Sequence, residues 1–404
     1  MLDFIGQTLE NPMHSLPSLV PEIEALQAEF MQIRQHIHQH PELGFEEVET
    51  SKLVAGYLRQ WGYEVHEGIG GTGVVGVLEL GDGKRAIGIR ADMDALPIKE
   101  DNNLAHQSRH AGKMHACGHD GHTAILLCAA RYLAESKCFN GTLNLIFQPA
   151  EETLGGALSM INDGLFERFP CDAVYALHNA PGLPVGYFVV QPGTMLASSD
   201  EVTIRLLGQG GHGAMPHLAK DPVVAVAEAI LALQTIVARN VPAAETAVIT
   251  VGMVNAGEAP NVIPAHATLQ LSVRATTPEV RALLQKRIGE VVRGVAMTHD
   301  MQVEVDYRPK VSTLFNSEAE TALARQVISD LVGPNNIKGA SKGGLGSEDF
   351  AWMLERVPGC YVALGNGNSG PTGCSVHNPG YDFNDLAIPY GASYWARLVQ
   401  AYLV

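Results

Sequence analysis

The order of strand-like and helix-like segments is the feature that most constrains the fold of this chain. Apolar runs of strand length occur at 73–80, 85–90, 141–148 and 173–177, and a helix-length apolar pattern occupies 121–136. Strands that alternate with helices favour a largely parallel sheet, because parallel neighbours need a crossover connection. We therefore expect an α/β unit with a mixed, largely parallel sheet flanked by helices. The helices at its start come from the region 21–61, which the Pro41–Gly44 turn divides in two.

A different pattern begins near residue 199. The segments with strand character are 201–207, 246–254, 267–275 and 301–307, and those with helical periodicity are 221–237 and 278–297. Asp221 is the expected N-cap of the first helix, because a proline follows it. The order β-α-β-β-α-β is that of the ferredoxin-like split unit, which is complete here within about 110 residues. The sequence predicts a main unit built from residues 1–198 and 308–404, with an inserted α+β unit at 199–307.

Composition excludes several classes of protein. The chain has 404 residues, of which 46% are hydrophobic and 17% charged, as in ordinary globular proteins. Its formal net charge of −16 makes it a poor partner for nucleic acid, which needs a basic surface. We find no polybasic patch for anionic lipid, and apolar runs such as 124–130 are too short to span a bilayer. We therefore expect binding to neither nucleic acid nor membrane.

The cysteines and the first residues bear on the compartment. Six cysteines in a chain of this length, without a positively charged leader at the start, do not indicate a disulfide framework. We expect reduced thiols and a cytoplasmic location. Most of these cysteines would be small buried side chains, which leaves room for one of them to be a metal ligand.

Histidines are unusually frequent, and five of the 16 fall between residues 106 and 122. In the densest part, Cys117 and His119 are separated by a glycine, so both side chains can point inward from one tight turn. Thiolate and imidazole are good ligands for borderline divalent metals. A solvated, histidine-rich loop would show the same pattern, so this motif alone leaves both interpretations open.

Three further segments carry ligand-type residues near predicted strand ends or in loops. Glu151 and Glu152 follow the run 141–148, where one carboxylate could bind a metal and the other could transfer protons. Two acids at the start of a helix are an equally ordinary explanation. His178 follows the run 173–177, and His377 lies in a loop rich in glycine and proline. Each alone is more often a core or loop histidine, but their joint placement at successive strand ends favours a metal site.

These residues belong to stretches through which the chain resembles the aminoacylase/carboxypeptidase family of dinuclear metallohydrolases, peptidase family M20. Within it, the chain resembles the subgroup of N-acyl-L-amino-acid amidohydrolases, which includes hippurate hydrolases and indole-acetyl-amino-acid hydrolases. The matching stretches are RQHIHQHPELGFE at 34–46, RADMDALP at 90–97, MHACGHDGHT at 114–123, QPAEE at 148–152, GGHGAMPH at 210–217, NVIP at 261–264, GSEDF at 346–350 and HNPGYDF at 377–383. They extend in order over nearly the whole chain.

The resemblance implies a role for each of these residues. The metal ligands would be Cys117, His119, Glu152, His178 and His377, with Cys117 bridging two ions. Glu151 would be the general base. Asp94 matches the acid that other members place two residues after a first metal histidine, but that histidine is Asp92 here.

The inserted unit would serve as a lid and dimerisation domain. Within it, His212 would help to stabilise the oxyanion, in its own subunit or in a neighbouring one, and Asn261 would contact the substrate. Arg274 matches an arginine that binds the carboxylate of the product amino acid. A flexible loop histidine and a solvated strand arginine are the simpler explanations of His212 and Arg274.

The implied activity is hydrolysis of the amide bond of an N-acyl-L-amino acid, with a small-molecule substrate and two divalent ions per subunit. Mn or Zn would fill the site, and Co and Ni also suit these ligands. We expect a homo-oligomer, either a dimer or a tetramer. The alternatives are a ureidohydrolase or carbamoyl-amino-acid hydrolase, a short-peptide peptidase on the same scaffold, and a non-catalytic metal-binding module.

Overall fold

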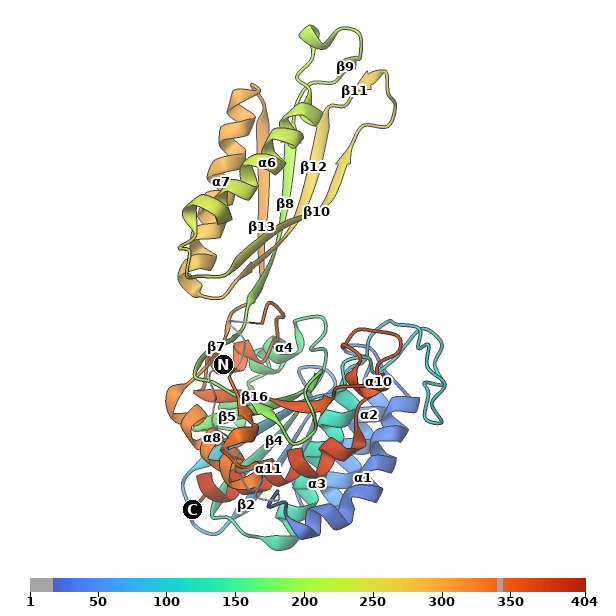
Figure 1. The fold of residues 1–404 in the computed structure, drawn as a ribbon, viewed down its shortest axis with the longest axis vertical. Helices are drawn as coiled ribbons and strands as arrows, with labels where there is room; N and C mark the ends of the chain where they lie inside the picture. Colours follow the sequence, from blue (N-terminus) through green and yellow to red (C-terminus); the bar gives the residue numbers. More distant parts are fainter. Residues whose placement is uncertain (1–16, 340–343) are drawn as a thin grey trace, which may run out of the picture.

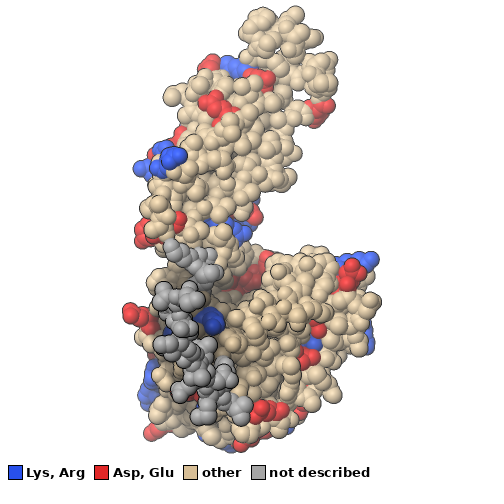
Figure 2. Space-filling view, in the orientation of Figure 1, with Lys and Arg blue, Asp and Glu red and all other residues tan. Residues whose placement is uncertain are grey.

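The computed structural model describes residues 17–339 and 344–404, and it shows two bodies joined by a narrow neck (Figure 1). The larger body contains both the first and the last described residues, and the smaller one projects from it as an elongated arm. On the face drawn in Figure 2, Lys and Arg are scattered singly among Asp and Glu outside the grey atoms.

The larger body, which we call the main unit, is built on an eight-stranded sheet with the order β1-β2-β4-β3-β5-β16-β6-β15. Its four central strands, β4, β3, β5 and β16, run parallel, whereas β1 and β2 are added antiparallel at one edge. The strands are β1 Glu64–Ile69, β2 Gly73–Leu80, β3 Ala86–Asp92, β4 Gly141–Gln148, β5 Ala173–Pro181, β6 Phe188–Val189, β15 Ile337–Lys338 and β16 Gly359–Gly367. This is the mixed, largely parallel sheet that the sequence predicts.

Helices cover both faces of this sheet. One face packs against α1 Pro21–Gln39, α2 Val48–Gln60, α3 His119–Ser136, α8 Glu318–Val332 and α11 Ile388–Tyr402. The other packs against the shorter helices α4 Gly156–Asn162, α5 Leu165–Arg168 and α9 Ala351–Leu354. The remaining elements are α10 Gly370–Gly373, the 3-10 turns η2 Pro334–Asn336 and η3 Asp385–Ala387, and the pair β7 Gly193–Leu196 and β14 Leu314–Asn316. Burial on both faces explains the continuous apolar character of the central strands.

The smaller body, which we call the inserted unit, has the element order expected for 199–307. Its elements are β8 Ser198–Leu207, α6 Pro222–Asn240, β10 Ala247–Ala256, β12 His266–Ala275, α7 Pro278–Thr298 and β13 Gln302–Val311. The four strands form an antiparallel sheet in the order β10-β12-β8-β13, with a separate core beneath α6 and α7. Asp221 caps α6 as expected, because its carboxylate accepts a hydrogen bond from the Val223 amide. The residues at which the two units divide stay a prediction.

Two features of the inserted unit were not expected. Helix α6 has the length and apolar composition of a membrane-spanning helix, although its buried side chains pack on the four-stranded sheet. A single such helix is weak evidence of a membrane, because core helices share these properties. At the far end of the arm, β9 Gly211–His212 pairs with β11 Val262–Ile263 (Figure 1). The 3-10 turn η1 Pro216–Leu218 follows β9 along the chain.

One buried arginine ties the two ends of the chain together. Arg34 of α1 is fully buried and donates to both carboxylate oxygens of Asp385, at 2.8 and 3.0 Å. The same guanidinium reaches Asp382 at 3.0 Å and Asp120 at 3.4 Å. Asp120 lies in the first turn of α3 and Asp382 in the loop before η3, so Arg34 fixes α3 and the C-terminal loop against α1.

Replacing Arg34 by Met should lower the free energy of unfolding by about 3–5 kcal/mol, because three carboxylates lose their buried partner. Chemical denaturation followed by circular dichroism measures this loss. Lys52→Met is the matched control, since the exposed Lys52–Glu49 pair contributes at most about 1 kcal/mol. Equal losses in the two variants would contradict the role assigned to Arg34.

Candidate metal centre and active site

Alternation along the central strands brings polar side chains to one face of the main sheet. Ile87 and Ile89 of β3 point into the core under α1 and α3. Successive side chains of a strand point to opposite faces of the sheet, so Arg90 and Asp92 lie on the other face, which α4 covers. Gln148 and His178 fall in the same register as the buried residues of that face on β4 and β5. Because the strands are parallel, these residues gather where the strands end.

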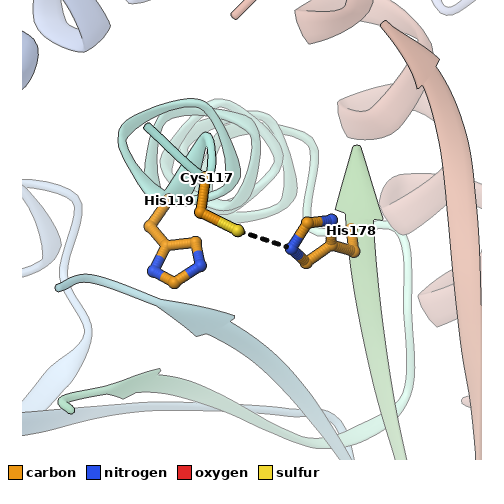
Figure 3. Close-up of side chains that lie close together, drawn as sticks. All are labelled: Cys117, His119 and His178. Atoms are coloured by element: carbon orange, nitrogen blue, oxygen red, sulfur yellow. Dashed lines mark hydrogen bonds between the residues drawn. The ribbon is translucent and has the colours of Figure 1, made fainter. Parts of the chain in front are cut away.

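Cys117 and His119 approach this edge from the start of α3. The glycine between them, Gly118, has φ +93°, a left-handed conformation that L side chains rarely adopt. A Cβ at Gly118 would also lie 2.5 Å from both the Asn179 side chain and the Tyr381 hydroxyl. Figure 3 shows the Cys117 side chain pointing toward His178, with the His119 ring beside it.

The ring nitrogens of two histidines are assigned by their partners. In His178, Nδ1 donates to the Asn179 carbonyl at 2.7 Å, which leaves Nε2 facing the Cys117 Sγ at 3.4 Å (Figure 3). In His119, Nδ1 contacts the Asp94 carboxylate at 3.1 Å, which leaves Nε2 free to bind. Metal-binding histidines usually donate their second ring nitrogen in this way. Burial lowers the pKa of His178 to about 3, so its ring is neutral.

Asp94 connects this group to the two glutamates. Its second oxygen accepts a hydrogen bond from the Glu152 backbone amide at 3.0 Å, while its first oxygen holds His119. The carboxylates of Glu151 and Glu152 each lie 4.0 Å from His119 Nε2. Ala150, which precedes them, has a positive φ of 51°, so a strained backbone directs the pair toward the ligands.

His377 completes the cluster from the C-terminal loop. Its Nε2 lies 3.2 Å from Glu152 Oε1, and its backbone amide donates to the Ala116 carbonyl at 2.8 Å. His377 also has a positive φ, 61°. The adjacent Glu152 carboxylate raises the pKa of His377 above its usual value. The structure thus brings together all five residues that the sequence analysis named as metal ligands.

The donor set fits two divalent ions. The ligand atoms of Cys117, His119 and His178 lie within 4.8 Å of one another, and so do those of Cys117, Glu152 and His377. The two triplets share only the Cys117 thiol. Among the described residues, His119 Nε2 and Glu152 Oε1 are buried without a hydrogen-bond partner, which is costly unless a ligand binds there. One thiolate, three imidazoles and a carboxylate suit Zn and the other borderline metals.

A second carboxylate cluster surrounds Glu151. The side chains of Glu151, Glu348 and Asp349 offer oxygens within 4.8 Å of one another. Burial raises the pKa of Glu151 well above its usual value, and the negative charges of Glu348 and Asp349 raise it further. Such a shift is typical of a carboxyl group that exchanges protons near neutral pH.

Arg90 balances these acids. It is fully buried and donates to Glu348 at 2.9 and 3.2 Å, to Asp92 at 2.8 Å and to Gln148 at 2.8 Å. Its contact with Asp349 is longer, at 3.4 Å. Arg90 and Glu348 both lie in the family-like motifs of the sequence, but neither has a role predicted from them. Their partnership has no local sequence signal, because 258 residues separate them.

The metal cluster opens into a cavity of about 840 Å³ between the two units. The wall on the main unit includes Glu151, Glu348 and apolar side chains such as Met195 and Leu196. Arg274 enters from β12 of the inserted unit, where its guanidinium donates to the Ser347 hydroxyl at 2.7 Å. The structure therefore places Arg274 in the same cavity as the expected ligands and base.

His212 and Asn261 do not reach this cavity within one chain. His212 forms β9, and the backbone carbonyl of Asn261 accepts a hydrogen bond from Gly213 beside it. The pair β9 and β11 lies at the far end of the arm, away from the main unit (Figure 1), and His212 and Asn261 are both exposed. The structure brings these two residues together, but not to the metal cluster of the same chain.

Three comparisons place the chain among known proteins. The model of the family described as peptidase family M20/M25/M40 matches residues 88–401. A hippurate hydrolase of Campylobacter jejuni is 46% identical over 386 residues, covering 96% of this chain and all of the relative. The IAA-amino acid hydrolase ILR1-like 2 of Arabidopsis thaliana is 38% identical, covering 92% of this chain and 85% of the relative.

A solved structure extends the similarity to the whole fold. The Bacillus subtilis YXEP protein, described as a dinuclear metal-binding peptidase from the M20 family, superimposes with a TM-score of 0.83 at 31% identity. The superposition covers 94% of this chain and 99% of that one. The overall fold of this chain therefore also occurs in a protein described as a dinuclear metal-binding peptidase.

In metal-free protein, Glu151→Gln should raise the free energy of unfolding, and more at pH 8 than at pH 5. The pKa of Glu151 is higher in the folded than in the unfolded chain, so its charge opposes folding once the pH exceeds about 4.3. We expect a gain of about 1–2 kcal/mol at pH 8. Denaturation of chelator-treated protein at both pH values measures it, and a pH-independent gain would contradict the raised pKa.

Proposed function

Because the chain belongs to peptidase family M20/M25/M40, we propose that it is a metal-dependent amidohydrolase that cleaves N-acyl-L-amino acids to a carboxylic acid and a free amino acid. The observation that carries the proposal is the convergence of Cys117, His119, Glu152, His178 and His377 beside the buried Glu151. The relatives named as hippurate hydrolase and IAA-amino acid hydrolase support the substrate class.

Two divalent ions are proposed as the resident cofactor, with Cys117 shared between them. His119 and His178 would hold one ion, and Glu152 and His377 the other, as the two triplets suggest. When bound, such ions lower the pKa of water and polarise a carbonyl group. We propose Mn or Zn, and Co or Ni would suit the same donors.

Glu151 is the proposed general base and acid. Its carboxylate takes a proton from the attacking water and later donates that proton to the departing amine. The neighbouring acids favour its protonated form, which helps this return of the proton. Asp94 acts on Glu151 only indirectly, by holding His119 and the backbone of Glu152 in place.

Arg274 is the proposed receptor of the substrate carboxylate. Its planar guanidinium can bind a carboxylate with two parallel hydrogen bonds. A ureidohydrolase or carbamoyl-amino-acid hydrolase, or a short-peptide peptidase, would need different contacts at the acyl end. The described residues of the cavity offer no observation that favours either alternative, and none favours a non-catalytic module.

His212 and Asn261 are proposed to act in the cavity of a second subunit. This explains why the arm carries them away from the cluster of their own chain (Figure 1). The inserted unit would then be both lid and dimerisation domain, and the protein a homodimer or a tetramer of such dimers. His212 would donate a hydrogen bond to the oxyanion, worth about 3 kcal/mol of transition-state stabilisation. A cytoplasmic location, with neither membrane nor nucleic acid as a partner, completes the proposal.

Purified protein reloaded with Mn or Zn should release glycine from N-benzoylglycine or amino acids from N-acetyl-amino acids, and chelation should stop the release. Glu151→Gln should lower kcat by about 10²–10⁴-fold, because it removes the proton acceptor. Metal content should stay near that of the wild type, since Glu151 is not a proposed ligand. Amine release assays and metal analysis measure both effects. Near-normal turnover in the variant would refute the general-base role.

Subunit mixing tests the role of His212. His212→Ala and Glu151→Gln should each be nearly inactive as homodimers. A mixed dimer contains one cavity with both an intact Glu151 and a partner's His212, so mixing should restore part of the wild-type activity. Restoration up to about one quarter is expected from random pairing of equal amounts, assuming independent sites. Absence of any restoration after verified subunit exchange would show that His212 acts in its own chain or not at all.

A further inference from the structure

Arg274 lacks an ion-pair partner in the described structure. By contrast, Arg34, Arg90 and Arg281 each contact at least one carboxylate within 4.0 Å. Among the described residues, Arg274 donates a side-chain hydrogen bond only to the Ser347 hydroxyl, at 2.7 Å. It is also the one Lys or Arg among the described residues that line the cavity. Its charge is therefore available to an anionic ligand.

A nearby carboxylate is held by other partners. Asp200 of β8 follows Ser199, the residue opposite Arg274 in the register of β12 and β8. Its oxygens accept hydrogen bonds from Arg281 Nε at 3.0 and 3.1 Å and from the Tyr307 hydroxyl at 2.6 Å. Asp200 is thus engaged by α7 and β13, and it does not form an ion pair with Arg274.

Ser347 directly precedes two residues that the core of the main unit holds in place. The next residue, Glu348, is bound by the buried Arg90, and Asp349 accepts hydrogen bonds from Gln148 at 2.7 Å and from the Ala157 amide at 2.9 Å. The Ser347 hydroxyl is therefore an acceptor whose position is set by the core of the main unit. Arg274 approaches it from the inserted unit.

Resting on the function proposed above, we propose that Ser347 is a positioning residue that directs Arg274 into the cavity and so sets the preference for substrates with a free carboxylate. An arginine side chain loses conformational freedom when it is ordered. Holding one Nη atom through a neutral hydroxyl removes part of that loss before substrate binds. Because serine carries no charge, the positive charge of Arg274 stays available to the substrate.

The test compares N-benzoylglycine with its primary amide, which lacks the carboxylate. Wild-type enzyme should prefer the acid. In Ser347→Ala, this preference should fall about tenfold, the factor expected for one hydrogen bond to a charged group, mainly through a higher KM for the acid. Ser347→Thr keeps a hydroxyl and should restore much of the preference. Ser312→Ala is the matched control, since among the described residues the buried Ser312 hydroxyl has no partner.

Calorimetric binding of the acid and the amide to the Glu151→Gln variant, with and without Ser347→Ala, separates recognition from catalysis. If Ser347→Ala weakens binding or turnover of acid and amide equally, Ser347 has only a structural role and the inference is wrong. If wild type does not prefer the acid, the role of Arg274 fails, and that of Ser347 with it. If binding shows the preference for the acid but the wild-type enzyme hydrolyses neither compound, the proposed reaction fails and the positioning role stands.

Discussion

The buried guanidinium of Arg90 is the interaction on which the arrangement of the site depends. Asp92, Glu348 and Asp349 lie around it on the face of the sheet next to Glu151, and Arg90 contacts all three. Without a cation, this many carboxyl groups would not remain together in a buried space. With it, each acid keeps a fixed orientation, and their excess negative charge acts on Glu151. One positive charge thus makes possible both the local geometry and the protonation behaviour of the proposed base.

Much of the fold could be predicted from the sequence because its signals are local. The strands β2 and β4 and the helices of the inserted unit follow their apolar periodicity closely, and Asp221 has the chemistry of an N-cap. Strand β1 was not predicted, because it lies at the sheet edge and its mixed polar residues show no clear alternation. The two-residue strands β9 and β11 are too short to produce a pattern at all.

The ligand residues of the site could be predicted from the sequence, but the contacts that hold the neighbouring side chains in place could not. The placement of ligand-type residues at strand ends and tight turns favours a metal site, and the resemblance to the family implies Cys117, His119, Glu152, His178 and His377 as its ligands. The partnership of Arg90 with Glu348, and that of Arg274 with Ser347, join distant segments by packing alone. The distance of His212 from its own cavity depends on how the two units are oriented, and no local pattern encodes that orientation.

The order in which the ligand residues occur along the chain has a consequence for biosynthesis. Four of the proposed ligands precede the inserted unit, and His377 follows it near the end of the chain. The inserted unit has its own hydrophobic core, so it can fold during synthesis. The complete set of proposed ligands comes together only after the last strand, β16, joins β5 and the C-terminal loop reaches Ala116. High-affinity metal uptake would therefore mark the completion of folding, and a chain interrupted before His377 would not retain both ions.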